Sequence, residues 1–341
     1  MLRPLTAVIA LMLLVLASCD SGDYDFDRGM AAFEKGDYEA ALTEWRPLAD
    51  QGDAKAQYRL GLMLSKGQGL RRDLGRALKM LQDAAANGNA PAQYKLAQIY
   101  TNLEGVEGNL AQAAKFMHMA AEQGDTQAQF ELAGLYLEGK GVERNTSEAA
   151  NWYLKGAEHG NAKAQYTLAG MYAEGLGVTW DYVQAANWYR KAAEQNHNPS
   201  RYELGVLNEK GLGMTKNFAK AAKFYRKAAE EGYAAAQYGL GVLIAEGRGV
   251  EKDPAAAVQW YHKAAAQEHP GAQAALGRHY VAGLGVAKDD VKAYMWFSLA
   301  TILGDKSAVK SQETLVLKMS PEQVSKARAV TAKRLEERKN N

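Results

Sequence analysis

Few residues of this chain have the type and spacing that a reaction requires. Ser307 and Lys310 have the spacing of a nucleophilic serine and its lysine partner, but the further motifs that accompany such a pair are missing. The six histidines form no cluster at metal-ligand spacing, and we expect them at the surface or at boundaries of the fold. We therefore predict no catalytic residue, no metal site and no cofactor.

Paired glycines, such as Gly139 and Gly141, recur along the chain and invite comparison with phosphate-binding loops. Such a loop follows a strand and carries a lysine after its glycines. The pairs in this chain lie between two predicted helices and lack that lysine. We interpret them as structural turns.

The elements that would position any site come from an internal repeat. A glycine, or a residue standing in for one, recurs every 36 residues along most of the chain. Seven units of this length are typical of a stacked array of helical hairpins. The repeated positions are Gly52, Gly88, Gly124, Gly160, Asn196, Gly232, Glu268 and Gly304.

The unit that begins at Gly124 predicts two helices. Small and apolar residues recur in each at helical spacing. Asn145 is placed to cap the second helix, and Gly160 ends it because that position favours positive φ. The two stripes are Ala128, Leu132, Ala133 and Tyr136, then Ala149, Trp152, Tyr153, Gly156 and Ala157. The predicted second-helix caps of all units are Asp73, Asn109, Asn145, Asp181, Asn217, Asp253 and Asp289.

Three motifs of the unit resemble the Sel1-like repeat, a relative of the tetratricopeptide repeat. They are Ala-x-Tyr/Phe-x-Leu-Gly/Ala, then Gly-x-Gly-Val, then Trp-Tyr-x-Lys-Ala-Ala, which Trp188 to Ala193 match most closely. The resemblance covers about Gly52 to Gly304 and implies an all-α fold, a right-handed α-solenoid of helix–turn–helix repeats. Two units depart from the pattern. Leu103 replaces a turn glycine, and Pro199, Ser200 and Arg201 replace Ala-x-Ala-Gln, so we expect an irregular start to that helix.

The predicted domain organisation follows from these patterns. A signal peptide covers 1–18, and a lipidated cysteine with an acidic tether covers 19–27. A tetratricopeptide-like capping hairpin covers 28–51, the seven repeats cover 52–303, and capping helices cover 304–341. Ser320, Pro321 and Gln323 have the pattern that starts a last helix.

The amino-terminal residues predict a location in a bacterial envelope. An apolar run from Leu5 to Leu16 has the length of a secretion signal rather than a membrane span. Leu16-Ala17-Ser18-Cys19 resembles the lipobox of bacterial lipoproteins, in which the cysteine receives lipid, and Cys19 is the only cysteine. An ordinary cleaved signal or an uncleaved anchor is the alternative. Asp20 resembles an inner-membrane retention signal, although the outer membrane stays possible.

The predicted function is that of a lipid-anchored scaffold that binds a protein or peptide partner. A formal charge of +2 and the lack of Lys/Arg runs argue against nucleic acid. Charged residues follow one face of the first helices outside the core pattern, which predicts a concave surface with a basic end and an acidic middle. A merely solvated face is the alternative. The predicted contacts are Arg59, Lys66, Lys95, Glu131, Glu138, Glu174 and Glu203.

Two other functions stay open at this point. Ser307 to Lys310 fits the serine–lysine tetrad of penicillin-recognising enzymes, and a cysteine-rich branch of the Sel1-like family is linked to β-lactam binding or hydrolysis. The paired cysteines of that branch are missing here. A β-lactamase-like or cell-wall amide hydrolase is therefore one alternative, and a soluble periplasmic binding module is the other.

Overall fold

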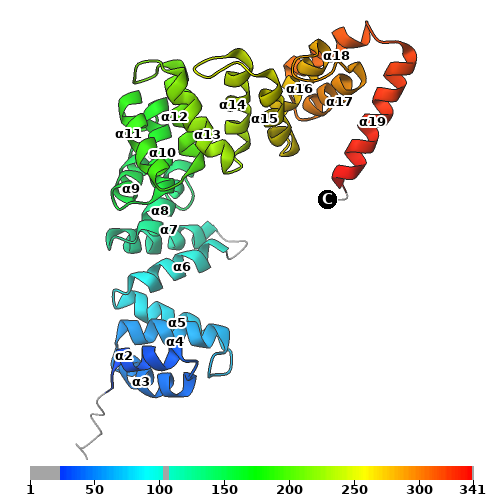
Figure 1. The fold of residues 1–341 in the computed structure, drawn as a ribbon. Helices are drawn as coiled ribbons and strands as arrows, with labels where there is room; N and C mark the ends of the chain where they lie inside the picture. The colour runs from blue at the N-terminus through cyan, green and yellow to red at the C-terminus, as the bar shows by residue number, and fades with distance from the viewer. Residues whose placement is uncertain (1–23, 103–106, 340–341) are drawn as a thin grey trace, which may run out of the picture. The chain divides into compact units, whose positions relative to one another are not determined.

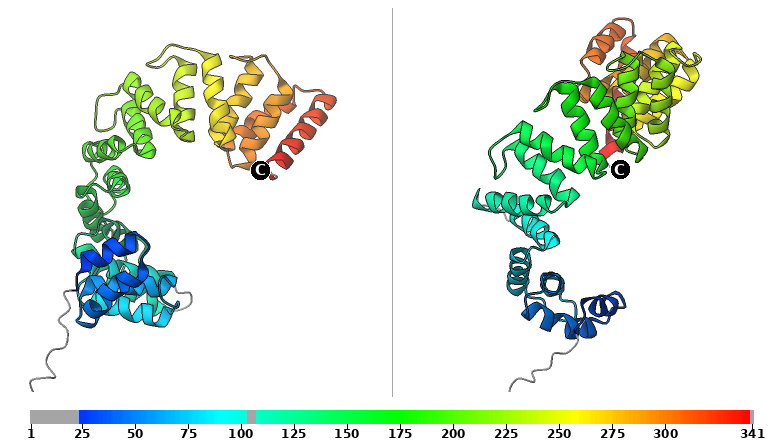
Figure 2. Two further views of the ribbon diagram at one scale, coloured as in Figure 1. Left: turned by 60° about the horizontal axis from the view of Figure 1, so that its bottom comes forward. Right: turned by 90° about the vertical axis from the view of Figure 1, so that its left-hand side faces the viewer.

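The computed structural model describes residues 24–102 and 107–339, and within these ranges every regular element is an α-helix (Figures 1 and 2). The predicted all-α array of helical hairpins is confirmed. The chain divides into two compact units, residues 1–152 and 153–341, and the division falls within α9. The predicted signal peptide, Cys19 and most of the predicted tether lie outside the described residues.

The helices of the first unit are short and regular. They are α2 (Phe26–Glu34), α3 (Tyr38–Asp50), α4 (Ala54–Lys66), α5 (Leu74–Ala86), α6 (Ala90–Asn102), α7 (Glu107–Glu122) and α8 (Thr126–Glu138), followed by α9 (Thr146–Glu158).

The second unit continues the same pattern. It contains α10 (Ala162–Glu174), α11 (Tyr182–Glu194), α12 (Asn198–Lys210), α13 (Phe218–Glu230), α14 (Ala234–Glu246), α15 (Pro254–Ala266), α16 (Pro270–Ala282), α17 (Asp290–Ile302), α18 (Lys306–Val316) and α19 (Pro321–Lys339).

Small residues let the two helices of each hairpin pack closely. α14 packs on α15 and α15 on α16, so each second helix also contacts the next first helix. In this part of the chain Ala236 and Leu240 of α14 and Ala257 and Ala264 of α15 are fully buried. The core is therefore distributed along the array instead of being gathered at one centre, as expected for repeat proteins.

Most predicted caps of the second helices are present. The side chains of Asp73, Asn145, Asp181, Asn217, Asp253 and Asp289 accept hydrogen bonds from backbone N–H groups of the first turn. The prediction for Asn109 is wrong, because α7 begins at Glu107 and Asn109 lies inside the helix. This is the repeat in which Leu103 replaces a turn glycine in the sequence.

The repeated glycine position requires a left-handed backbone. Gly160 and Gly232 both have φ of 88°. The predicted stand-ins adopt the same conformation, with φ of 64° at Asn196 and 63° at Glu268. Each first helix therefore starts from a turn whose shape is held even where glycine is absent.

The predicted irregular start of the helix after Asn196 is wrong. α12 has the same 13-residue length as its neighbours and begins at Asn198. Pro199 sits in the first turn, where a missing N–H costs no helical hydrogen bond. His197 makes no side-chain cap hydrogen bond, and neither does Tyr233 at the N-cap of α14.

A row of buried glutamines, which sequence reasoning did not interpret, joins the hairpins. In α14, Gln237 is 4% exposed and its Nε2 donates to Ala229 O in the last turn of α13 over 3.1 Å. Its Oε1 accepts a hydrogen bond from Gln267, at the end of α15, over 2.9 Å. One side chain thus links three helices. The same donation to the preceding helix is made by Gln57, Gln93, Gln129, Gln165 and Gln273.

The two kinds of glycine predict different costs of substitution. A Cβ at Gly232 would meet nothing within 4 Å, so Gly232→Ala is expected to cost only the left-handed conformation, about 1 kcal/mol. A Cβ at Gly249, which has φ of 68°, would collide with the backbone of Phe218 and Ala219 at the start of α13. Gly249→Ala is therefore expected to cost about 2–4 kcal/mol. Urea unfolding of both variants checks this, and equal losses would contradict the role of Gly249 in repeat contact.

Candidate functional site

The predicted contact residues all lie on first helices, with different degrees of exposure. Those that are half-buried are Arg59 on α4, Lys95 on α6, Glu131 on α8 and Glu203 on α12. Those that are exposed are Lys66 on α4, Glu138 on α8 and Glu174 on α10. Within each unit, we call the side that these positions occupy the first-helix face.

Within residues 24–152, this face joins neighbouring first helices directly. The hydroxyl of Tyr94 on α6 donates to Glu131 Oε1 on α8 over 2.6 Å, and Gln127 donates to the same oxygen over 2.8 Å. Burial, with the hydrogen bond to Glu131 as second cause, raises the pKa of Tyr94 to about 12. Glu138 pairs with Lys140 over 2.5 Å. Both acidic residues predicted here thus have partners within the chain.

Glu203 has a different environment. Burial raises the pKa of its carboxyl, and Lys210 offsets only part of this effect. Within the described part of the chain, its carboxylate makes no hydrogen bond or ion pair of standard length. Burial and, second, the charge of Glu203 raise the pKa of four tyrosines. These are Tyr166, Tyr189, Tyr202 and Tyr233.

Aromatic contacts continue along the first-helix face on both sides of Glu203. The ring of Tyr166 lies 5.0 Å from that of His197, and Tyr202 lies 5.7 Å from Tyr233. The third pair, Tyr238 and His269, is separated by 4.8 Å. All six side chains are half-buried. We call these three pairs the aromatic row.

Sequence reasoning missed the aromatic row because it assigned the tyrosines to packing and the histidines to isolated surface positions. The available signal was a constant separation of 31 residues within each pair (197 − 166, 233 − 202 and 269 − 238). Each pair joins a residue inside one first helix to the N-cap position of the next first helix. The row is therefore a product of the repeat and also a half-exposed surface.

The histidines of the aromatic row predict acid sensitivity. Burial lowers the pKa of His197 and His269 below the ordinary 6.5, so the unfolded chain binds more protons at acid pH. Their contribution to stability is present above pH 6.5 and is lost as pH falls through that value. The Tm is expected to fall between pH 7.5 and 5.5.

His269→Asn tests this, because an asparagine keeps the N-cap acceptor that His269 Nδ1 provides to Ala272 N–H. The variant should show a weaker dependence of Tm on pH, measured by circular dichroism. An unchanged pH dependence would mean that other groups dominate. Asp305 acts in the opposite direction on His269 and is retained in the variant.

The other candidate site is the serine–lysine pair, Ser307 and Lys310. Ser307 Oγ donates to Asp305 Oδ1 over 2.6 Å at the start of α18, so its proton points to a carboxylate and not to Lys310. The hydrogen bonds to Ser307 and Ala308 lower the pKa of Asp305 despite its partial burial, which makes Asp305 a weak base. No group of metal-ligating side chains occurs in the described ranges, and no helix there has the length and apolar character of a membrane span.

Comparison with known proteins places the repeats in a family. The Sel1 repeat model matches residues 54–89, 90–125, 126–161, 162–197, 199–233, 234–269 and 270–305. The crystal structure of a Sel1 repeat protein from Oxalobacter formigenes is 36% identical, covers 65% of this chain and 88% of that chain, and superimposes with a TM-score of 0.59. A protective antigen present in uropathogenic Escherichia coli strains is 28% identical over 91% of this chain and 83% of that chain, with a TM-score of 0.43.

A curated relative matches a much smaller segment. DAP3-binding cell death enhancer 1 of Mus musculus is 44% identical over 50 residues, which is 15% of this chain and 10% of that protein. The chain thus spans about a tenth of the length of the curated relatives that it matches.

Proposed function

Because the chain belongs to the Sel1 repeat family, we propose that it is a scaffold that holds a protein or peptide partner on its first-helix face. Sel1 repeats are typically protein–protein interaction modules. A stack of hairpins presents one equivalent position per repeat, so neighbouring positions form a continuous surface suited to an extended segment.

The observation that carries this proposal is the half-buried carboxylate of Glu203 within the aromatic row. Tyrosine is enriched at protein interfaces, because its ring contributes contact area and its hydroxyl contributes hydrogen bonds. A carboxylate that is partly removed from water and lacks a close cation gains from an incoming one. We infer that the partner presents a lysine, an arginine or an amino terminus to Glu203, with apolar groups on the adjacent rings.

The charged residues of the first unit are the other candidate contacts. Arg59, Lys66 and Lys95 make no ion pair within the described residues, so their charges are available to a partner. Glu131 and Glu138 already have partners in the chain, and their contribution would require an exchange of those contacts. We therefore expect these charged residues to orient the bound partner, and Glu203 to contribute more of the binding affinity.

Glu203→Gln tests the proposal in a capture experiment. Immobilised full-length chain is incubated with a bacterial envelope extract, and captured proteins are quantified by mass spectrometry. Loss of a charged hydrogen bond is expected to reduce specific capture roughly tenfold. Capture by the wild type should also fall as pH is lowered through the pKa of Glu203, which lies above the ordinary 4.5.

Glu230→Gln on α13 is the matched control, because Glu230 is exposed on a second helix and the charge change is the same. It should leave capture unchanged. Equal capture by the wild type and both variants would overturn the assignment of Glu203. Equal losses in both variants would show that net charge, and not the first-helix face, controls binding.

We further propose that Cys19 carries lipid and anchors the chain at a bacterial membrane, facing the periplasm. The support is the motif Leu16-Ala17-Ser18-Cys19 after an apolar run, and Asp20 favours the inner membrane. Acyl chains stabilise membrane attachment by about 0.8 kcal/mol per buried CH₂ group, so two or more chains anchor a protein durably.

Cys19→Ala is expected to abolish incorporation of radiolabelled palmitate and to shift the protein from the membrane pellet to the soluble or unprocessed fraction. Detection of the label and fractionation on a sucrose gradient check this in a bacterial host. Ser18→Ala changes a neighbouring residue without removing the thiol and serves as the control. Palmitate labelling that survives in Cys19→Ala would contradict lipidation at this residue.

A further inference from the structure

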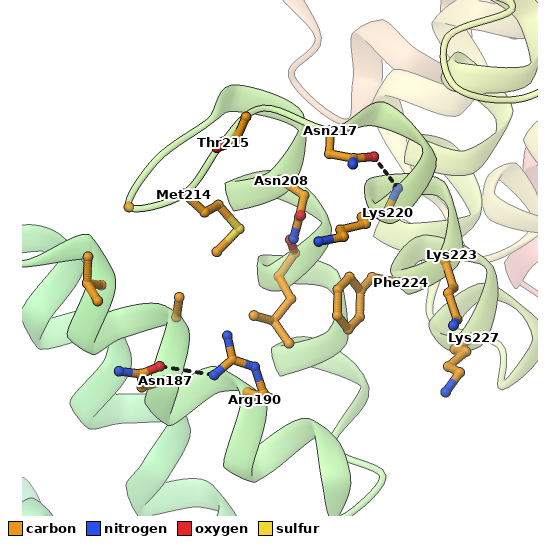
Figure 3. A pocket seen from close by; sticks show the side chains of 14 residues that line it. Asn187, Arg190, Asn208, Met214, Thr215, Asn217, Lys220, Lys223, Phe224 and Lys227 are labelled. Carbon is orange, nitrogen blue, oxygen red and sulfur yellow. Dashed lines mark hydrogen bonds between the residues drawn. The ribbon is translucent and has the colours of Figure 1, made fainter.

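A cavity of about 600 Å³ lies among α11, α12 and α13, away from the aromatic row (Figure 3). Arg190 on α11 lines it together with Lys220, Lys223, Phe224 and Lys227 on one face of α13. Figure 3 shows Arg190 and Lys220 reaching from different helices toward the same space, with Phe224 beside Lys220. Volumes of this size are typical of small-molecule sites.

One buried position beside the cavity holds a smaller, polar residue than in the other repeats. Asn208 on α12, which is 4% exposed, occupies the position held elsewhere in the chain by a larger apolar or aromatic residue. Those residues are Leu64, Tyr100, Tyr136, Tyr172, Ile244 and Tyr280. Asn208 turns its Nδ2 to Leu204 O over 2.7 Å and does not extend into the space.

In the repeat 72 residues later, a tyrosine occupies the same place (280 − 208 = 72). In that repeat, Tyr280 occupies the position of Asn208, Trp296 that of Phe224 and His262 that of Arg190. The ring of His262 lies 6.4 Å from Tyr280 and 5.6 Å from Trp296. Lys292, the counterpart of Lys220, lies over the ring of Tyr280 at 5.6 Å. The tyrosine ring therefore fills the space that Asn208 leaves open.

The charge of the two places also differs. Arg190, Lys220, Lys223 and Lys227 correspond to His262, Lys292, Met295 and Leu299. Burial lowers the pKa of His262 and so favours its neutral form. Of these four counterparts only Lys292 therefore keeps a positive charge, whereas all four residues at the cavity are cations. Within the described residues, none of the four cations at the cavity makes an ion pair, and no carboxylate lines it. Arg190 only donates to Asn187 Oδ1 over 3.0 Å.

We propose that this cavity binds a small molecule that combines a flat aromatic ring with a phosphate group. The ring takes the place of the missing tyrosine side chain beside Phe224, where aromatic pairs are favourable. The phosphate lies between Arg190 and Lys220, and arginine suits this role because its guanidinium can donate two hydrogen bonds to one phosphate. Lys223 and Lys227 add attraction at the rim. This site is independent of the proposed partner surface.

Calorimetric titration of the full chain compares phenyl phosphate, AMP and inorganic phosphate at about 0.05 M salt, where electrostatic attraction is screened less. We expect phenyl phosphate and AMP to bind at least tenfold more tightly than inorganic phosphate, because only they supply the ring. Equal affinity for all three would overturn the ring assignment. Absence of heat with both ring phosphates at millimolar concentration would overturn the site.

Two variants locate the binding. Arg190→Gln with Lys220→Gln changes exposed side chains and should weaken AMP binding roughly tenfold or more. Asn208→Tyr restores the residue type of other repeats and should abolish AMP binding by filling the cavity. The matched control is Arg226→Gln, which changes the same charge at the equivalent position one repeat later, behind Ile244 and Trp260. Binding that survives both cavity variants, or is lost equally in the control, would overturn the assignment.

Circular dichroism separates loss of the site from loss of the fold. The arginine and lysine variants should keep the helical signal and the Tm of the wild type within a few degrees, because they change exposed side chains. If Asn208→Tyr lowers the Tm strongly, the double variant decides alone, because Arg190 and Lys220 are exposed.

Discussion

A buried side-chain amide holds most hairpins to the one before it. Ala157 O and Ala229 O each accept one hydrogen bond from the backbone of the following turn, from Gly160 N–H and Gly232 N–H respectively, over 3.1 Å. Gln165 donates a second hydrogen bond to Ala157 O over 2.9 Å, and Gln237 does the same for Ala229 O. An apolar residue of similar size would fill the space but would lose this hydrogen bond between hairpins. The spacing of the hairpins therefore depends on a hydrogen bond as well as on alanine packing.

The exceptions to this link occur where the repeat pattern itself changes. Arg201 replaces the glutamine in α12 and donates to Asn198 over 2.9 Å, near the turn. In α16 the Oε1 of Gln273 lacks a partner, because Leu303 stands where Gln267 serves the preceding repeat. The α12 repeat also carries Asn208 and the cavity. A local departure from the repeat thus lies beside the cavity among α11, α12 and α13.

The array separates two kinds of surface. First helices contribute the aromatic row with Glu203, which lies across consecutive repeats and suits an extended partner. Second helices contribute the basic cavity, which belongs to one junction and suits a small ligand. Asn208 marks the cavity because it differs from its counterparts in other repeats, whereas the tyrosines of the aromatic row belong to the repeat pattern itself. Comparison of one repeat with another inside the chain is therefore a direct way to find functional positions.

The sequence by itself determined the repeat length, the two helices of each unit, most of their caps and the left-handed positions at Asn196 and Glu268. These depend on contacts within about one turn of the chain, so residue type and spacing are sufficient. The cap predicted at Asn109 was wrong because α7 begins at Glu107, and the irregular start predicted for α12 was wrong because a proline in the first turn is harmless. The predicted contacts on first helices remain a prediction about binding.

Only the tertiary structure decided which polar side chains have a hydrogen-bond partner within the fold and which do not. Glu131 and Glu203 occupy the same position of their repeats, yet Tyr94 supplies a hydrogen bond to Glu131 and no side chain does so for Glu203 in the described residues. Arg190 reads in the sequence as part of a family motif, and its position beside an unfilled cavity follows from Asn208 on another helix. Such differences depend on distances between residues far apart in the chain, which spacing alone does not specify.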